Sequence, residues 1–522
     1  MRTRALFVLV ALLGGCANRS GGGTGNVVDA VVAPMLQKDG VKPTVAGDTE
    51  LCRRYAIDLS GVAPSWDEYV AHCRGKSPSE IVDYFMAQPD YVRVNQRLWA
   101  DAFQYDNRTV WYQYLQDLDA QVGALYRGEL GYPDFAAIAM THPAFVGEFV
   151  GENVVAYGYQ ALLGRDALPE ERSDMLSLYR MWRSRPAYDA SIGAFRYNAC
   201  ASDADCSAGR TCQPLPSGAS KVCTDTSNYR ELYLEPRACA GAFGAINCTS
   251  AAHDASAILA GSAPIALGDL TADQWNVVRT PGRVITQQRY FYEAAADRTL
   301  AKYLGWWHLG VELPGYEIPA VRQALATLLA QKGDLRAMER ELLTSVLYTM
   351  PADNSGADTV LWHHGPTKQM IAESWIDSVG KFTGVALGAC DWRYPLQSLR
   401  WLPASLFPPA GALPSFAYQA TARTMGGCPD QKTQSRYTDV GVLYAMEQRS
   451  LLAAACSDKS ASKVAAAASA TALVQSAYRE ALTWDPPADE LKAVAATLPA
   501  GDKPTAQQLC QAILRSSRFL FY

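Results

Sequence analysis

The stretch Leu51–Pro64, with the sequence LCRRYAIDLSGVAP, sets the pattern from which the fold is predicted. Its aromatic-led segment, Tyr55–Leu59, passes through a turn at Gly61 to the acidic pair Asp67–Glu68. Proline ends one helix and suits the start of the next, and carboxylates in a first helical turn face the positive end of the helix dipole. The stretch therefore predicts two consecutive helices joined by a tight turn.

The same pattern recurs further along the chain. Tyr159–Leu163 leads to Glu170–Glu171, and Tyr478–Leu482 leads to Asp489–Glu490, each across a proline-containing turn. A second pattern, a short helix that closes on an aromatic residue, occurs at 81–91, 135–145, 335–348 and 509–519. We interpret both patterns as repeated helical hairpins; chance similarity among helical hairpins is the alternative.

Periodicity extends this prediction to most of the chain. Val321–Leu329 has helical spacing, a second helix restarts after Asp334, and Val464–Leu482 is an uninterrupted alanine-rich stretch. Strand signals are few. We predict a mainly α, multi-helical fold of helical-hairpin elements with a small disulfide-rich insertion. The predicted parts are a lipoprotein signal peptide (1–15), a flexible tether (16–45), an N-terminal helical domain (46–195), a cysteine-rich insertion (196–250), a central helical domain (251–385) and a C-terminal region that is first loop-rich and then helical (386–522).

The first sixteen residues indicate export and lipid attachment. Arg2 and Arg4 precede an apolar run too short to span a bilayer, and Leu13-Gly14-Gly15-Cys16 follows, which resembles a bacterial lipobox. Acyl chains such as palmitate on Cys16 would anchor the protein to a membrane without a spanning helix. An ordinary secretory signal with a coincidental Cys16 is the alternative. We predict an envelope lipoprotein, most simply of the outer membrane, facing the periplasm or the cell surface.

The remaining twelve cysteines form an even set, which in an oxidising compartment favours disulfides. Spacing favours the pairs Cys52–Cys73, Cys239–Cys248, Cys390–Cys428 and Cys456–Cys510. The segment from Cys200 to Cys223 resembles Dickkopf-like cysteine-rich modules, and an interleaved pairing of Cys200 with Cys212 and Cys206 with Cys223 suits that resemblance. Zinc is a poorer interpretation of this segment, because Cys-x2-Cys spacing and an accompanying His are missing from it.

Few residues predict chemistry. Trp306-Trp307-His308 and Trp362-His363-His364 are the candidate ligand-binding clusters. Histidines of this kind serve as metal ligands or general bases. Core packing of the tryptophans is the alternative, and adjacent histidines point in different directions, which disfavours one shared metal. We predict no metal and no cofactor, and Cys-x-x-Cys-His, the c-type haem signature, is absent from the sequence.

Three segments near the quoted stretch carry a family resemblance. Leu51–Pro64, Val82–Tyr91 and Arg97–Phe103 resemble the first of two domains of unknown function that occur in exported planctomycete proteins with cytochrome c modules. Asp297–Gly305 and Asp334–Tyr348 resemble the partner domain, and Ala512–Tyr522 is similar to a further domain of such proteins. The resemblance implies export and a helical fold but no established reaction, and this chain lacks the haem module.

Two functional hypotheses follow. A formal net charge of −5 without long like-charge runs disfavours nucleic acid as a partner. The main hypothesis is a lipid-anchored, noncatalytic helical scaffold that binds an envelope protein or a polysaccharide; the 12 Trp, 27 Tyr and 14 Phe suit such contacts. The alternative is an extracytoplasmic hydrolase or metal-dependent enzyme with a site lined by the His and Trp clusters.

Overall fold

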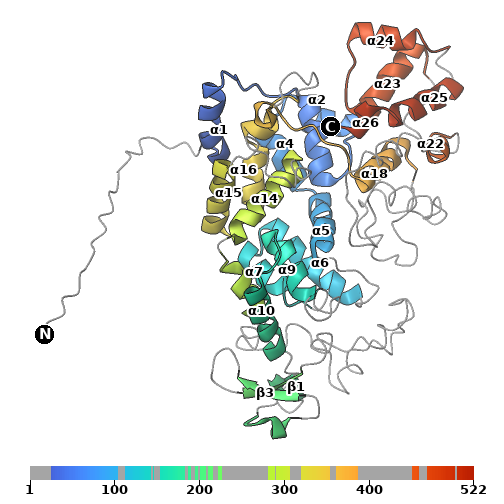
Figure 1. Cartoon of the computed structure of the whole chain (residues 1–522). Coiled ribbons are helices and arrows are strands. Elements are labelled where there is room, and N and C mark those ends of the chain that lie inside the picture. The colour runs from blue at the N-terminus through green and yellow to red at the C-terminus, as the bar shows by residue number, and fades with distance from the viewer. Residues whose placement is uncertain are drawn as a thin grey trace.

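The computed structural model is mainly helical, as predicted (Figure 1). The residues that it describes are 25–103, 112–142, 145, 153–182, 186–189, 194–197, 200–206, 210–214, 221–225, 280–288, 290–305, 319–352, 360–385, 449–457, 467–499 and 503–522.

In the N-terminal third, the described residues form helices joined by short turns. They are α1 (Val27–Lys38), α2 (Asp48–Tyr55), the π-helical turn η1 (Ala56–Ser60), α3 (Trp66–His72), α4 (Pro78–Met86), α5 (Pro89–Phe103), α6 (Tyr112–Arg127), α7 (Tyr132–Ala139), α9 (Asn153–Leu163) and α10 (Pro169–Trp182). The acidic pairs of the repeated pattern stand in first helical turns, as predicted: Asp67 and Glu68 in α3, and Glu170 and Glu171 in α10.

Two small antiparallel hairpins follow α10, which agrees with the prediction of few strands. The first pairs β1 (Pro186–Asp189) with β2 (Ala194–Tyr197), and the second pairs β3 (Arg210–Pro214) with β4 (Lys221–Asp225). The short 3-10 helix η2 (Asp203–Asp205) precedes β3. The second hairpin lies in the predicted cysteine-rich insertion, where sequence alternation is too short to reveal it.

The later helices form the rest of the described chain. They are α13 (Thr280–Thr286), α14 (Phe291–Leu304), α15 (Pro319–Lys332), α16 (Leu335–Leu343), α17 (Val346–Thr349), the 3-10 helix η7 (Leu361–His363), α18 (Ala372–Thr383), α22 (Arg449–Ala455), α23 (Ala470–Leu482), α24 (Ala488–Ala495), α25 (Lys503–Leu514) and α26 (Ser517–Leu520). The prediction of one helix over Val464–Leu482 is wrong at its start: Ser469 caps α23 by accepting from the backbone N–H of Ala472, which sets the first turn at Ala470.

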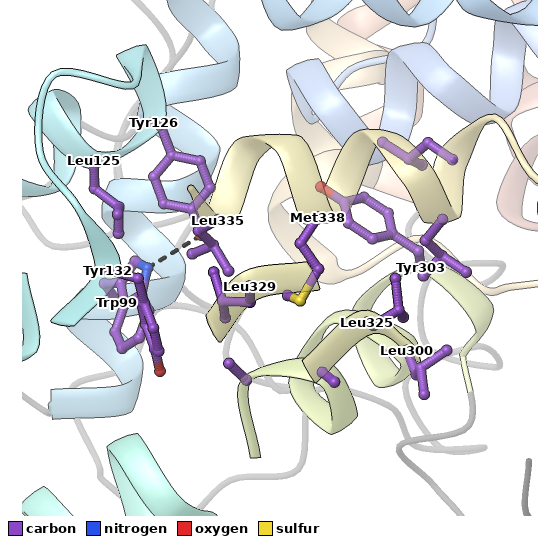
Figure 2. Close-up of a cluster of buried hydrophobic side chains, with 14 of the residues drawn as sticks. Trp99, Leu125, Tyr126, Tyr132, Leu300, Tyr303, Leu325, Leu329, Leu335 and Met338 are labelled. Carbon is purple, nitrogen blue, oxygen red and sulfur yellow. Dashed lines mark hydrogen bonds between the residues drawn. The ribbon is translucent and has the colours of Figure 1, made fainter. Parts of the chain in front are cut away.

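One hydrophobic cluster is shared by the N-terminal and central helices. Trp99 of α5 and Tyr132 of α7 lie close to Leu329 and Leu335 of the central region (Figure 2). Trp99 donates its indole N–H to the Tyr126 hydroxyl at 3.2 Å. The stretches 46–195 and 251–385 therefore do not have separate cores, because a single set of buried side chains joins them.

The predicted tether over 16–45 is wrong over Val27–Lys38, which forms a helix. Helix α1 buries Val28, Val32 and Leu36 against this same cluster, and it lies beside α15 (Figure 1). Asn26 caps the helix by accepting hydrogen bonds from two backbone N–H groups. The apolar spacing of i, i+4 and i+8 explains why this segment packs as a helix rather than remaining a linker.

A second hydrophobic cluster contains α18 and the C-terminal helices. Trp375 of α18 is fully buried there with side chains of α22, α23 and α25. The predicted boundary at 385 therefore separates α18 from the helices that it packs against. Residues 368–370 and 520–522 pair as a short antiparallel bridge, with the Lys368 N–H donating to the Tyr522 carbonyl oxygen at 2.8 Å.

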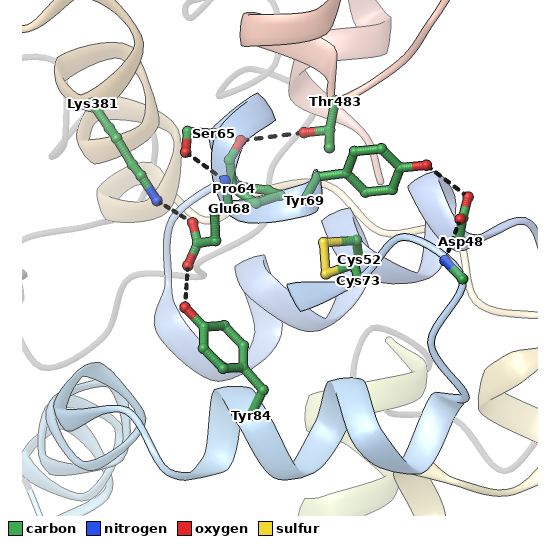
Figure 3. The surroundings of a disulfide bond; sticks show 11 residues. Asp48, Cys52, Pro64, Ser65, Glu68, Tyr69, Cys73, Tyr84, Lys381 and Thr483 are labelled. Carbon is green, nitrogen blue, oxygen red and sulfur yellow. Dashed lines mark hydrogen bonds and ion pairs between the residues drawn. A yellow bond between two sulfur atoms is a disulfide. The ribbon is translucent and has the colours of Figure 1, made fainter. Parts of the chain in front are cut away.

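Three predicted disulfides are confirmed. They are Cys52–Cys73, Cys200–Cys212 and Cys456–Cys510. Around the first bridge, Glu68 accepts from Lys381 of α18 at 2.9 Å (Figure 3). Cys206 is also disulfide-bonded. The side chain of Cys223 and the whole of Cys16, Cys239, Cys248, Cys390 and Cys428 lie outside the described residues.

The repeated pattern ends each time in the same backbone conformation. After Tyr55, Tyr159 and Tyr478, the turn contains a left-handed residue: Gly61 (φ +74°), Gly164 (φ +65°) and Thr483 (φ +55°) respectively. A left-handed residue is a common way to end a helix and usually is glycine. Among the described residues, Thr483 is the one non-glycine with positive φ.

Candidate binding cleft and its charged floor

A cleft of about 580 Å³ opens where the N-terminal helices meet the C-terminal ones. Helix α2 contributes one wall, the turn between α23 and α24 a second, and α26 with the residues after it a third. The lining residues are Thr49, Glu50, Arg53, Ala352, Thr367, Leu482, Thr483, Trp484, Ser517, Arg518, Phe521 and Tyr522. The volume is in the range of small-molecule binding sites.

Thr483 is held at the cleft in a strained conformation. A β-branched residue in the left-handed region costs energy that the surroundings must offset. The Thr483 side chain is fully buried, and its hydroxyl donates to the Pro64 carbonyl oxygen at 3.2 Å (Figure 3). This bond joins the first and last copies of the repeated turn, and strained residues of this kind concentrate at functional sites.

An aromatic residue follows the strained position. The Arg518 guanidinium stands 4.7 Å from the ring centre of Trp484, and the Tyr478 ring is 5.8 Å away. Arg518 is half-exposed and also pairs with Glu490. A partly exposed indole beside hydroxyls and a guanidinium offers both an apolar face and polar contacts.

Arg53 supplies the buried positive charge of the cleft. Its guanidinium donates to the carbonyl oxygens of Ala481 and Phe519, at 3.0 and 2.8 Å. Burial lowers the pKa of Arg53 to about 10, while the charge of Tyr522 acts in the opposite direction, so Arg53 stays protonated at neutral pH. Its Nε is buried without a hydrogen-bond partner.

Beneath the cleft lies a buried charged centre on the π-helical turn. Asp58 accepts from the hydroxyls of Tyr348 and Tyr522, at 2.6 and 2.7 Å, and it pairs with the Lys368 ammonium. Burial lowers the pKa of Lys368 to about 8, opposed by Asp58 and reinforced by the charges of Arg54 and Lys302. π-Helical turns occur often at functional sites, and here the turn directs Asp58 toward the centre.

A second buried pair continues this centre into the first core. Lys302 donates to Glu339 at 3.1 Å and to Asn95 at 2.8 Å. The hydroxyls of Tyr91 and Tyr303 both donate to Glu339 at 2.7 Å. The Lys368 ammonium donates to the Lys302 carbonyl oxygen at 3.1 Å, so the two pairs form one connected polar network. Burial and the charge of Glu339 raise the pKa values of both tyrosines.

In the described half of the predicted His/Trp site, the two histidines contact different groups. Trp362 is buried in the first core, and its ring meets His363 edge to face. His363 lies 3.3 Å from Asp39, whereas the Nδ1 of His364 lies 3.3 Å from the Gly365 carbonyl oxygen. Trp306, Trp307 and His308 lie outside the described residues, so their meeting with the other three stays a prediction.

Among the residues that the structure describes, no group of three or more His, Cys, Asp or Glu is placed to hold a metal ion. No described helix combines the length and hydrophobicity needed to span a membrane. One of the acidic residues at the helix starts has a structural partner: Glu171 forms two 2.7 Å contacts with Arg165.

Sequence reasoning missed the cleft. Arg53 and Asp58 both lie in the stretch LCRRYAIDLSGVAP, but helical spacing gives no reason to expect them to be buried. The available signals were two adjacent arginines and an aspartate on an otherwise apolar helical segment, which call for buried partners. Those partners lie about 290 to 470 positions away, at Tyr348, Lys368, Ala481, Phe519 and Tyr522.

Residues 27–125 match the protein family PSCyt2, described as a protein of unknown function (DUF1549). This region contains Leu51–Pro64, Val82–Tyr91 and Arg97–Phe103, and the match agrees with the resemblance found in those segments. It covers α1 to α5 and most of α6, including Arg53 and Asp58. No curated protein and no solved structure matches the chain.

Proposed function

We propose that the protein is a lipid-anchored component of the bacterial cell envelope, a noncatalytic helical scaffold that holds an envelope polysaccharide in the cleft between α2 and α26. The observation that carries the binding role is the lining of the cleft: hydroxyls, guanidiniums and a partly exposed indole side by side. Sugars present hydroxyl groups and apolar C–H faces, which these groups complement.

The uncommitted hydroxyls of the cleft support this role. The side chains of Thr49, Thr367 and Ser517 line it and form no hydrogen bond with another described residue. The proposal for the envelope rests on the signal and Cys16. His363 and His364 contact different groups, so these two residues do not form the shared histidine site that the enzymatic alternative requires.

The binding role is tested with the full chain purified in detergent. Peptidoglycan sacculi, polygalacturonate and a neutral galactan serve as probes in co-sedimentation or affinity electrophoresis. We expect the wild-type chain to retain at least one of them and Trp484→Ala to lose most of that retention. Trp66→Ala is the matched control, because Trp66 is also partly buried, with the Arg479 guanidinium 4.9 Å from its ring, but does not line the cleft. Retention of no glycan by the wild-type chain contradicts the proposal.

The anchor is tested separately in cells. The wild-type chain is expected to incorporate labelled palmitate and to fractionate with membranes, and Cys16→Ser is expected to lose the label. Equal labelling of Cys16→Ser and wild type would exclude Cys16 as the lipid attachment site.

A further inference from the structure

The cleft carries positive charge on a protein whose overall charge is negative. Arg53 and Arg518 line it, together with one acidic side chain, Glu50. Glu50 is already engaged: it pairs with Arg54 and accepts from the Ala352 backbone N–H at 2.9 Å. The formal net charge of the whole chain is −5, so the positive character belongs to the cleft.

The burial of Arg53 makes its positive charge energetically unfavourable. The residue is 6% exposed, and among the described residues no Asp or Glu side chain forms an ion pair with it. Its hydrogen bonds go to two carbonyl oxygens, and its Nε has no partner. Burial of a guanidinium is unfavourable, the charge of Tyr522 offsets part of that cost, and an anion bound beside Arg53 would offset more.

Arg518 lines the same cleft from α26 and can contact such an anion. Its side chain is 55% exposed and paired with Glu490, a surface contact that contributes little and can exchange for a ligand. Guanidinium groups bind carboxylates in a two-pronged geometry, which gives orientation as well as attraction.

We infer that the cleft recognises an acidic polysaccharide, with a sugar carboxylate held between Arg53 and Arg518 and the sugar ring against Trp484. The inference rests on the proposed glycan-binding function and adds the charge of the ligand. The partly exposed indole of Trp484 favours a sugar over an acidic peptide, because a sugar ring presents an apolar C–H face to an aromatic ring.

The test compares an acidic polysaccharide with its uncharged ester and with an acidic peptide. Polygalacturonate and its methyl ester share a backbone, so the full chain in detergent is titrated with each, and with poly-glutamate as the peptide probe. We expect at least tenfold tighter binding of the acid than of the ester, weakening as salt is raised from 50 to 500 mM. We also expect poly-glutamate to bind at least tenfold more weakly than polygalacturonate.

Two variants locate the contact. Arg518→Gln is expected to lose at least tenfold in affinity for polygalacturonate. Arg53→Lys, if it folds, is expected to lose affinity by the same factor. Arg340→Gln is the matched control, a partly exposed arginine paired with Asp83 away from the cleft. Equal binding of acid and ester, equal binding of poly-glutamate, or an unaffected Arg518→Gln overturns the inference. Retention of neutral galactan or sacculi in that case leaves the proposed function standing, whereas retention of no glycan overturns both.

Discussion

Asp58 is the residue on which the buried network depends most. It is 7% exposed, and it accepts hydrogen bonds from Tyr348, Lys368 and Tyr522, each from a different part of the chain. A buried ion pair adds little net stability over apolar residues, but removal of one partner leaves the other charge buried and uncompensated.

We therefore expect Asp58→Asn to lower the free energy of unfolding by about 3–5 kcal/mol, the range for a broken buried pair. The double variant Asp58→Asn, Lys368→Met is expected to recover most of that loss, because it removes the orphaned cation. Urea unfolding followed by circular dichroism measures both. Asp67→Asn, at an exposed position of α3, is the control. A loss from Asp58→Asn no larger than that of the control would show that the pair is not buried as described.

The pKa of Lys368 predicts a pH dependence. Burial lowers this pKa from 10.5 to about 8 in the folded chain. Between these values the unfolded chain holds the proton and the folded chain does not, so stability due to this group rises with pH over that window and is constant below it. Above pH 10 the raised pKa of Tyr348 acts in the opposite direction, because tyrosines ionise first in the unfolded chain.

From pH 7.5 to 9.5, the wild type is expected to gain on the order of 1–2 kcal/mol of stability relative to Lys368→Met. Urea titrations of both proteins at the two pH values measure the difference. Lys76→Met, at the surface, should show no such gain. If the wild type loses stability relative to Lys368→Met over this range, the direction of the pKa shift is wrong.

At the scale of elements, the turn that ends η1 sets the position of Asp58 and therefore of the buried polar network around it. Gly61 closes the π-helical turn at φ +74°, and a Cβ at this position would come within 2.9 Å of the Val94 side chain. Gly164 occupies the corresponding turn after α9 at φ +65°, with open space around its Cα. The two glycines share a conformation but differ in packing.

Gly61→Ala is expected to destabilise the protein more than Gly164→Ala. Both substitutions incur the left-handed cost of about 1–2 kcal/mol. The first also forces Val94 to move, which adds about 1–3 kcal/mol of overpacking. Thermal or urea unfolding of the two variants gives the comparison directly. Equal losses of stability in the two variants would mean that α5 accommodates the added methyl group without an energetic cost.

At the scale of the whole molecule, Arg53 joins two hydrophobic clusters. It lies on α2, whose Leu51, Cys52 and Tyr55 belong to the first cluster, and it donates to the ends of two C-terminal helices. Buried polar contacts of this kind specify how two surfaces dock.

We expect Arg53→Met to loosen the C-terminal helices selectively. Hydrogen exchange in α23 and α26 should accelerate by about tenfold or more, equivalent to about 1.4 kcal/mol, while α16 is little changed. Arg127→Met, at a surface pair with Glu129, is the control. Equal acceleration in α16 would show that the clusters open together, and no acceleration would show that Arg53 does not hold the C-terminal helices.

Much of the fold could be predicted from local signals. The helices after Pro319 and Asp334, the acidic first turns and the Cys52–Cys73 bridge follow from residues close together in the sequence. The prediction of a tether failed at α1. Its three buried residues are stabilised by packing against α15, a contact that the local sequence does not reveal. The cleft was not predicted at all, since none of its walls is distinctive alone.

The sequence by itself determined the mainly helical fold, the positions of the repeated turns and the expectation of lipid attachment at Cys16. These depend on spacings of a few residues, within which helix periodicity, capping and charge act directly. Only the tertiary structure decided that Arg53 would line a cleft and that Asp58 would meet Lys368 and Tyr522. Such partners lie 310 and 464 positions from Asp58, and their meeting depends on which apolar surfaces bury one another.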